Sequence, residues 1–235
     1  MQTKAVSVES NQLLGRLPRR ALSKVLVSCV EVELVFREVL AEAGAPIRQV
    51  LFPLQSIISL TASIGPHQGL EVGLIGDEGM LGATLLLGVD LAPLHALVQG
   101  QGSALSMSRA QFLAVAAGDS ALHRILSRYL YVLMQQLAQT AACTRFHVVE
   151  ARLARWLLMT HDRTHADGLH VTQEFLAWML GVRRVGVTTA AGALQRRQLI
   201  HYARGEITIL DRIGLEAAAC SCYEADRATY AAGMN

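Results

Sequence analysis

The sequence has few of the features that mark secreted or membrane-spanning proteins. Its 235 residues contain only four cysteines, at positions 29, 143, 220 and 222, with neither CxxC pairs nor the density of a disulfide scaffold. Hydrophobic residues make up 52% of the chain, yet no uninterrupted apolar run reaches the roughly 18 residues that a membrane span needs. No secretory signal is visible near the N-terminus. We therefore expect a cytoplasmic protein with no membrane partner.

Motifs of common enzyme and metal sites are also missing. The sequence has no GxSxG, no P-loop and no recognisable pair of catalytic carboxylates. Four residues of metal-ligand type fall within ten positions, but no cysteine or glutamate nearby completes a tetrahedral set, so we interpret them as solvated loop residues: His161, Asp162, His165 and His170. Cys220 and Cys222 could form a redox pair or half of a metal site, and solvent-facing or packed thiols are the interpretation we favour. The sequence predicts neither an enzyme nor a metal site.

Charge is distributed unevenly along the chain, although the net charge is only +2. Between residues 49 and 108 every ionisable side chain other than histidine is acidic. Between residues 145 and 204 nine arginines stand against four acidic residues, a local net charge of +5. A basic C-terminal third is what binding to a phosphate backbone requires, although arginines also solvate ordinary helical surfaces.

The N-terminal half shows two local patterns in succession, the first helical and the second strand-like. Residues 11–40 predict helix, because apolar residues such as Leu13, Leu17 and Leu22 recur at helical spacing. From Arg48 to Ser108, short β-branched and apolar runs are separated by Gly and Pro, beginning with Pro53 and Gly65-Pro66. Many short strands with glycine turns predict an all-β roll or barrel.

A long helix is predicted after Gly118. Asp119 and Ser120 are candidate N-caps, and the next glycine or proline is Gly168. The helix carries a leucine seam at alternating spacings of four and three: Leu126, Leu130, Leu133 and Leu137. Such a seam indicates either a coiled-coil contact or packing on the chain's own β-domain. We favour dimerisation through these leucines, because the apolar stripe is wide enough to serve both contacts.

Residues 172–200 predict two short helices joined at Gly181, and the second is bordered by Arg183, Arg184, Arg196 and Arg197. An arginine-marked second helix is typical of proteins that enter the DNA major groove. A helix over 149–159 and a polar loop over 164–170 precede the pair. A hairpin turning at Gly205 follows it, which completes a winged helix, and residues 216–230 predict a closing helix.

These residues also follow a known pattern. The helix pair reads T..E.LA..LGV.R..V from Thr172 to Val187, and the segment after it reads L...LI.Y.RG.I.ILD from Leu194 to Asp211. The chain thereby resembles the Crp/Fnr family of bacterial transcription regulators, with a weaker match at GDEGMLG (76–82). The resemblance implies an α+β fold with a cyclic-nucleotide-binding-like β-roll sensor over residues 1–118. A dimerisation helix over 119–147 and a winged helix-turn-helix over 148–235 would follow.

The chain departs from two ligand-binding branches of that family. Relatives that bind cyclic AMP have a Glu directly after the glycine equivalent to Gly79, and this chain has Met80 there. Those relatives also have an arginine further along the chain, and the segment around His95 offers none here. We therefore expect a degenerate effector pocket at Gly79, Met80 and His95 that does not bind cyclic AMP. The oxygen-sensing branch holds an iron–sulfur cluster with several N-terminal cysteines, and Cys29 alone cannot do so. We expect no cofactor.

The resemblance assigns roles within the helix pair. Base-reading roles fall on Arg184, Val185, Thr188 and Thr189, with Arg184 matched to guanine. DNA-backbone roles fall on Thr172, Arg183, Arg196, Arg197 and Arg204. The expected partners are double-stranded DNA, a second copy of the chain and, if transcription is activated, RNA polymerase. The alternative is a small-molecule or redox sensor whose β-roll is the working part.

Overall fold

The computed structural model describes residues 11–64, 67–164 and 168–235. These residues divide between two compact units. The first unit lies within residues 1–60 and 75–132, and the second is formed mainly by residues 61–74 and 133–233. Among the described residues, no helix combines the length and the apolar character that crossing a membrane requires. The division into domains at residues 118 and 147 stays a prediction.

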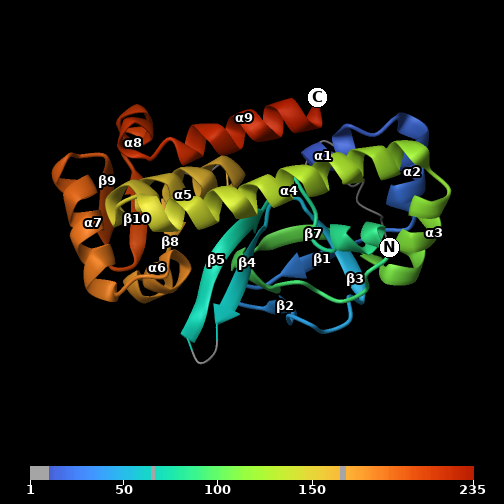
Figure 1. Ribbon diagram of the computed structural model, residues 1–235, viewed down its shortest axis with the longest axis horizontal. Helices are drawn as coiled ribbons and strands as arrows, with labels where there is room; N and C mark the ends of the chain where they lie inside the picture. The colour runs from blue at the N-terminus through green and yellow to red at the C-terminus, as the bar shows by residue number, and fades with distance from the viewer. Residues whose placement is uncertain (1–10, 65–66, 165–167) are drawn as a thin grey trace, which may run out of the picture. The chain divides into compact units, whose positions relative to one another are not determined.

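A β-roll built from two sheets dominates the first half of the chain (Figure 1). One sheet has the strand order β1–β7–β3 and the other the order β2–β6–β4–β5. The strands are β1 (Val30–Leu34), β2 (Val39–Ala41), β3 (Gln49–Pro53), β4 (Ile57–Ile64), β5 (His67–Ile75), β6 (His95–Gly100) and β7 (Gly102–Ser108). This arrangement confirms the predicted roll, although the Gly65-Pro66 turn lies outside the described residues.

Strands β3 and β7 pair antiparallel, and their buried side chains form part of the core of the roll. Val50 is opposite Met107 and Phe52 is opposite Leu105, and all four side chains are buried. The strands β3 and β7 therefore face apolar partners across the ladder, which is the main stabilising contact of a sheet. A short 3-10 helix, η2 (Ala83–Leu87), interrupts the strands between two left-handed glycines, Gly82 and Gly88.

The predicted N-terminal helix is wrong beyond residue 27. The chain forms α1 (Gln12–Gly15) and α2 (Arg19–Val27), and then enters β1 and β2. The reason lies in the sequence VEVEL at Val30–Leu34, where valines alternate with glutamates at the two-residue period of a strand. The apolar spacing that indicated helix ends at Leu26, before that alternation begins.

The long helix begins where it was predicted and is preceded by one that was not. The Asp119 carboxylate accepts hydrogen bonds from the backbone N–H groups of Ala121 and Leu122, which caps α4 (Ser120–Phe146). The additional helix is α3 (Arg109–Ala117), which starts with a capping box formed by Ser108 and Gln111. A bend at His147 leads into α5 (Val149–Thr164), as predicted, although α5 extends one turn further than expected.

The remaining elements form a winged helix (Figure 1). They are β8 (Gly168–His170), α6 (Gln173–Leu180), α7 (Arg184–Arg196), β9 (Ile200–Ala203), β10 (Glu206–Ile209), α8 (Arg212–Ala218) and α9 (Cys222–Met234). The strands form one sheet in the order β8–β10–β9. The predicted loop at 164–170 is therefore partly strand, because Gly168–His170 pairs with β10; residues 165–167 lie outside the described residues.

The closing segment is two helices and not the single one expected. Asp211 caps α8 by accepting a hydrogen bond from the Gly214 N–H at 2.9 Å. The helix ends at Ala218, and Ala219 has an extended backbone with φ −69° and ψ 157°. Cys220 therefore lies in the bend between α8 and α9, and Cys222 begins α9.

A buried ion pair joins α5 to α9. Arg155 donates from Nη2 to Asp226 Oδ2 at 2.6 Å and from Nε to the same oxygen at 3.1 Å. Both side chains are only 7% exposed. Because the pair is shielded from water, each charge depends on the other for compensation.

Asp226→Asn should lower the free energy of unfolding by about 3 kcal/mol, because it leaves the Arg155 guanidinium buried without its counter-charge. Urea denaturation followed by tryptophan fluorescence measures the change. The matched control is Asp90→Asn, which breaks the exposed Arg109–Asp90 pair. That change should cost no more than about 1 kcal/mol. Equal losses in the two variants would contradict the role of the buried pair.

Candidate nucleic-acid interface

The turn between α6 and α7 is fixed at both ends of α6. Thr172 caps α6 by accepting a hydrogen bond from the Phe175 N–H at 3.2 Å. Gly181 ends the helix in the left-handed conformation, with φ +61° and ψ 40°. A Cβ at this position would also lie 2.7 Å from Leu70 Cδ1. The left-handed backbone therefore favours glycine at the turn, and a side chain there would also require Leu70 to move.

Helix α7 has one buried face and one exposed face. The buried face consists of Val187, Ala190, Ala191 and Leu194 and packs against α5 and α6. The four residues predicted to read bases are all exposed: Arg184, Val185, Thr188 and Thr189. Val185 is 69% exposed, so its apolar side chain is available for contact with a partner.

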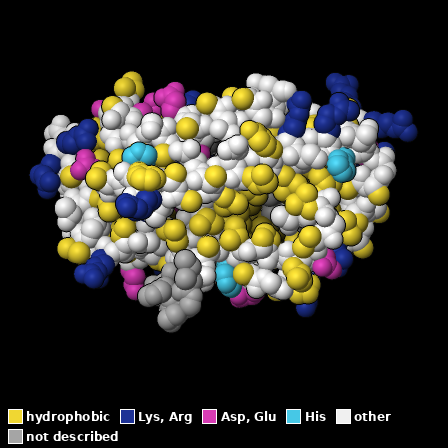
Figure 2. Space-filling model, viewed as in Figure 1, with side chains coloured by type: hydrophobic (Ala, Val, Ile, Leu, Met, Phe, Trp, Pro, Cys, Tyr) yellow, Lys and Arg dark blue, Asp and Glu magenta, His cyan; other side chains and the backbone are white. Residues whose placement is uncertain are grey.

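The residues predicted to contact the DNA backbone are exposed as well. They are Thr172, Arg183, Arg196, Arg197 and Arg204. Figure 2 shows Lys and Arg side chains standing out from the surface in the region of α7 and the β9–β10 hairpin. Arg204 and Gly205 form the hairpin turn with φ values of +52° and +84°, so Arg204 stands at the tip of the wing.

Some of these side chains already have partners within the protein. Arg197 Nη1 lies 3.0 Å from Glu150 Oε1 in a half-exposed ion pair. Thr188 Oγ1 donates to Gln173 Oε1 at 2.8 Å, and Thr189 Oγ1 donates to the Val185 carbonyl at 2.9 Å. Both hydroxyls retain lone pairs, so they remain acceptors for a base amino group.

Two glutamines organise this surface and were not predicted. Gln173, the first residue of α6, positions Thr188 of α7 through the hydrogen bond above. Gln195, near the end of α7, accepts a hydrogen bond from the Tyr202 N–H at 2.6 Å and so ties the wing to α7. Burial raises the pKa of Tyr202, while the charge of nearby Arg184 lowers it. In the sequence, the one sign that Gln173 positions Thr188 is its place next to Thr172, the residue that caps α6.

The basic charge of this region is smaller at the surface than the sequence suggested. Arg152, Arg155 and Arg163 are 8%, 6% and 9% exposed, so three of the nine arginines between residues 145 and 204 are buried. A buried guanidinium does not face a phosphate. The electrostatic attraction for an anionic partner therefore rests on the arginines that border α7 and on the wing.

The residues of the predicted effector pocket face other partners. Met80 is 1% exposed and belongs to the core of the first unit. A Cβ at Gly79 would overlap the Tyr129 ring. His95 Nδ1 lies 2.9 Å from Glu42 Oε2, so its ring pairs with a carboxylate of the protein.

The leucine seam of α4 is largely internal. Leu126 and Leu130 are 1% and 8% exposed, whereas Leu133 and Leu137 are half-buried. The exposed large apolar side chains of the helix are Tyr131, Met134 and, at its end, Phe146, at 52%, 64% and 76%. The first two leucines therefore pack within the chain itself, which is the second of the two interpretations given for the seam.

The histidine-rich segment does not gather into a metal site among the described residues. His161 Nδ1 and Asp162 Oδ1 both contact the guanidinium of Arg212, at 2.6 and 2.7 Å. His170 pairs with Glu206 on the neighbouring strand. His165 lies outside the described residues.

A glycine-linked helix pair whose second helix exposes arginines, followed by a β-wing, defines a winged helix-turn-helix protein. Residues 151–218 match the family model described as the Crp-like helix-turn-helix domain. The chain therefore carries a Crp-like helix-turn-helix domain, and its α+β architecture is that of Crp/Fnr transcription regulators. The predicted resemblance and fold class are confirmed.

Solved structures support the same fold over most of the chain. FixK2 from Bradyrhizobium japonicum is 14% identical, with a TM-score of 0.69, over 82% of this chain and 98% of that one. The c-di-GMP-responsive global regulator CLP of Xanthomonas campestris is 16% identical, with a TM-score of 0.67, over 82% and 99%. A Crp/Fnr family transcriptional regulator from Eubacterium rectale is 13% identical, with a TM-score of 0.69, over 89% and 98%. The comparison with curated proteins gave no match.

Two glycines in α7 provide a test of how its exposed face is used. At 3.6 residues per turn, Gly192 falls at the centre of the exposed face and Gly186 near its edge. A Cβ would meet nothing closer than 3.9 Å at Gly186 and only the Arg196 Nη1, at 3.5 Å, at Gly192. Alanine at either position should stabilise the protein by up to about 1 kcal/mol, measured by urea denaturation.

The two variants should differ in DNA binding. Gly192→Ala should weaken it several-fold, because a methyl group at the centre of the face holds the backbone away from a groove, whereas Gly186→Ala should leave it unchanged. Fluorescence anisotropy with a labelled duplex measures both affinities. Identical affinities for the two variants would show that DNA does not approach the α7 backbone closely at Gly192.

Proposed function

We propose that the protein is a sequence-specific regulator of transcription that binds double-stranded DNA as a homodimer. The observation that carries the proposal is the exposed face of α7, which presents Arg184, Val185, Thr188 and Thr189 side by side on a helix anchored by its opposite face. An α-helix fits the width of the major groove, and side chains on its outer face can then reach base edges.

Each exposed side chain suits a particular contact. The Arg184 guanidinium can donate two hydrogen bonds to O6 and N7 of guanine, and Val185 can pack on a thymine methyl group. Thr188 and Thr189 can accept hydrogen bonds from base amino groups, and could donate to phosphates only by giving up their bonds to Gln173 and the Val185 carbonyl. Sequence preference would therefore depend mainly on Arg184.

Contacts with the phosphates would come from the ends of the motif. Thr172 and Arg183 lie at the starts of α6 and α7, Arg196 and Arg197 at the end of α7, and Arg204 on the wing. Contacts at several points along a duplex fix its orientation without reading its sequence. Because Arg197 is paired with Glu150, binding a phosphate would first have to compete with that carboxylate.

A homodimer would place two copies of α7 about 34 Å apart, one turn of DNA, on a pseudo-palindromic site. The exposed stripe of α4 is suited to the contact between copies, because Tyr131 and Met134 are followed at helical spacing by the exposed Ala138 and Ala141. Figure 2 shows hydrophobic side chains gathered along α4. Leu133 and Leu137 border this stripe and can contribute, whereas Leu126 and Leu130 cannot without unpacking.

The proposal assigns no cyclic AMP to the β-roll. Met80 is buried where cyclic-AMP-binding relatives have Glu, and His95 is paired with Glu42. A regulator of this kind acts in the cytoplasm, has no catalytic activity of its own and contacts RNA polymerase if it activates. The alternative, a sensor whose β-roll is the main working part, requires a ligand that these residues do not favour.

Two arginine variants test the proposal on the protein's selected target sequence. Arg184→Ala should weaken binding to that sequence by about 1–3 kcal/mol and leave unrelated duplexes almost unaffected. Arg204→Ala should weaken all duplexes alike and reduce the slope of log affinity against log salt by about 1. Anisotropy titrations against target and scrambled duplexes at several salt concentrations measure both effects.

Two outcomes would contradict the proposal. If the wild-type protein bound target and scrambled duplexes equally, α7 would not read sequence. If Arg184→Ala lowered affinity for every duplex equally, Arg184 would be a phosphate contact and the base-reading assignment would be wrong.

A further inference from the structure

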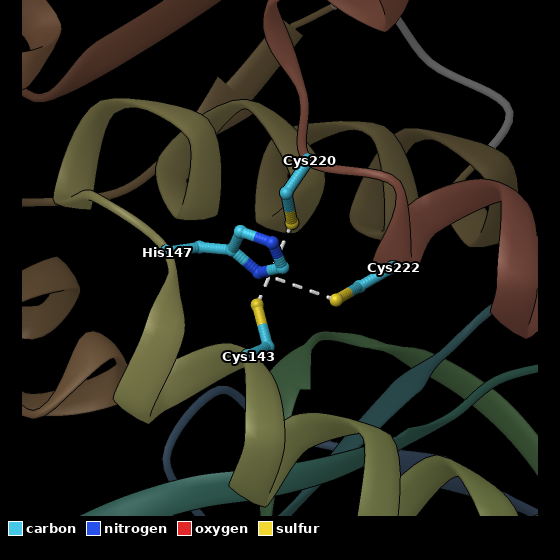
Figure 3. A group of neighbouring side chains, drawn as sticks. All are labelled: Cys143, His147, Cys220 and Cys222. Atoms are coloured by element: carbon cyan, nitrogen blue, oxygen red, sulfur yellow. Dashed lines mark hydrogen bonds between the residues drawn. The ribbon is translucent and has the colours of Figure 1, made fainter.

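Four side chains of metal-ligand type converge in the second unit (Figure 3). Cys143 lies in the last turn of α4 and His147 just beyond its end, so they are one helical turn apart. Cys220 occupies the bend between α8 and α9, and Cys222 is the first residue of α9. The bends at His147 and at Ala219 bring the two pairs together although they are more than 70 residues apart in sequence.

The four side chains point toward one another, and their ligand atoms all lie within 4.8 Å of each other. Cys143 Sγ is 3.5 Å from Cys220 Sγ, and Cys222 Sγ is 3.4 Å from His147 Nδ1. In a tetrahedral zinc site with bonds of about 2.3 Å to sulfur and 2.0–2.1 Å to nitrogen, neighbouring ligand atoms are about 3.5–3.8 Å apart. The separations of 3.4 and 3.5 Å are close to those of such a shell, and the widest, at most 4.8 Å, would shorten by about 1 Å when the ion binds.

We propose that Cys143, His147, Cys220 and Cys222 bind one zinc ion in a closed tetrahedral Cys₃His site. Three thiolates and an imidazole are a ligand set that structural zinc sites use. A cluster of several iron atoms would place the thiolates on different metal atoms, and so needs larger separations than these. Binding releases the thiol protons to solvent, because the sulfur ligands are thiolates.

The burial of the cluster suits a structural ion. Cys143, Cys220 and Cys222 are 2%, 8% and 1% exposed. Gln139 Nε2 donates a hydrogen bond to Cys222 Sγ at 2.9 Å. Ligands of metal sites are commonly oriented by such outer hydrogen bonds, which also stabilise thiolate charge. No open side of the cluster is needed, because a structural ion has no substrate.

A nearby buried arginine supplies an independent argument for an anionic site. Arg152 is 8% exposed and donates to the Leu180 carbonyl at 2.5 Å, but among the described residues no carboxylate forms an ion pair with it. Arg152 and Cys143 line the same cavity within the second unit. Zinc with three thiolates and a neutral imidazole carries one negative charge, which would compensate this buried cation.

The competing explanation is that the three thiols are simply small buried apolar groups. That explanation leaves Arg152 without a counter-charge and gives no reason for the His147 ring to point among three sulfurs. The ion would join the end of α4 to the junction of α8 and α9, and so hold the helices around the DNA-binding motif. This role is independent of the proposed function, since a protein that bound no DNA could have the same site.

The test is the zinc content of the full-length protein, purified under reducing conditions and measured by mass spectrometry. We expect one equivalent of zinc per chain. Cys143→Ser, Cys220→Ser and Cys222→Ser should each reduce the content to near zero. Cys29→Ser is the matched control and should retain one equivalent, because Cys29 lies in the first unit and burial raises the pKa of its thiol to about 11.

Cobalt(II) substitution of the wild-type protein keeps the test decisive if a serine variant does not fold. Bound cobalt should show the intense visible bands of tetrahedral coordination and a near-ultraviolet band from thiolate. Wild-type protein that acquires neither zinc nor this spectrum would overturn the proposal. A Cys143–Cys220 disulfide found in reduced, zinc-supplied protein, or equal zinc loss in Cys29→Ser, would overturn it as well.

Discussion

The packing of the apolar face of α7 onto α5 and α6 is the interaction on which the candidate DNA-binding surface depends. Val187, Ala190, Ala191 and Leu194 bury one side of the helix, and this fixes the direction in which the other side points. The helix has little intrinsic stability, because it contains two glycines. Tertiary packing therefore determines both that α7 forms and that Arg184 faces outward.

Helix α5 links this packing to the rest of the second unit. One of its faces contacts α6, α7 and α8, while Arg155 pairs with Asp226 of α9 and Arg152 caps the end of α6 at Leu180. Both arginines are buried, as is Arg163 in the last turn, so α5 carries three positive charges into a region of low dielectric constant. The carboxylate of Asp226 compensates Arg155, and the proposed thiolate site would compensate Arg152.

The helix pair and the wing could be predicted from the sequence because their signals are local. The Thr172 cap, Gly181 and the turn at Gly205 each determine the backbone conformation within a few residues. The N-terminal strands β1 and β2 were missed, since the helical spacing of Leu13–Leu26 was extended past the point where Val30 and Val32 begin to alternate with glutamates. The ends of helices and strands are set by such changes in apolar spacing over a few residues.

The groups that depend on long-range contacts could not be predicted. The spacing of Cys220 and Cys222 indicated at most half of a metal site. Nothing in the local sequence indicates that Cys143 and His147 lie beside them. A count of charged residues in the sequence likewise cannot show that Arg152, Arg155 and Arg163 are buried. The same holds for Leu126 and Leu130, whose seam is equally compatible with a partner helix and with the chain's own core.

The most direct test of the central claim is methylation interference on the duplex that the protein selects from a random pool. Methyl groups at guanine N7 lie in the major groove and those at adenine N3 in the minor groove. If the exposed face of α7 enters the major groove of two half-sites, N7 methylation should block binding in two clusters about 10 base pairs apart. Interference confined to adenine N3, or absent altogether, would contradict the account.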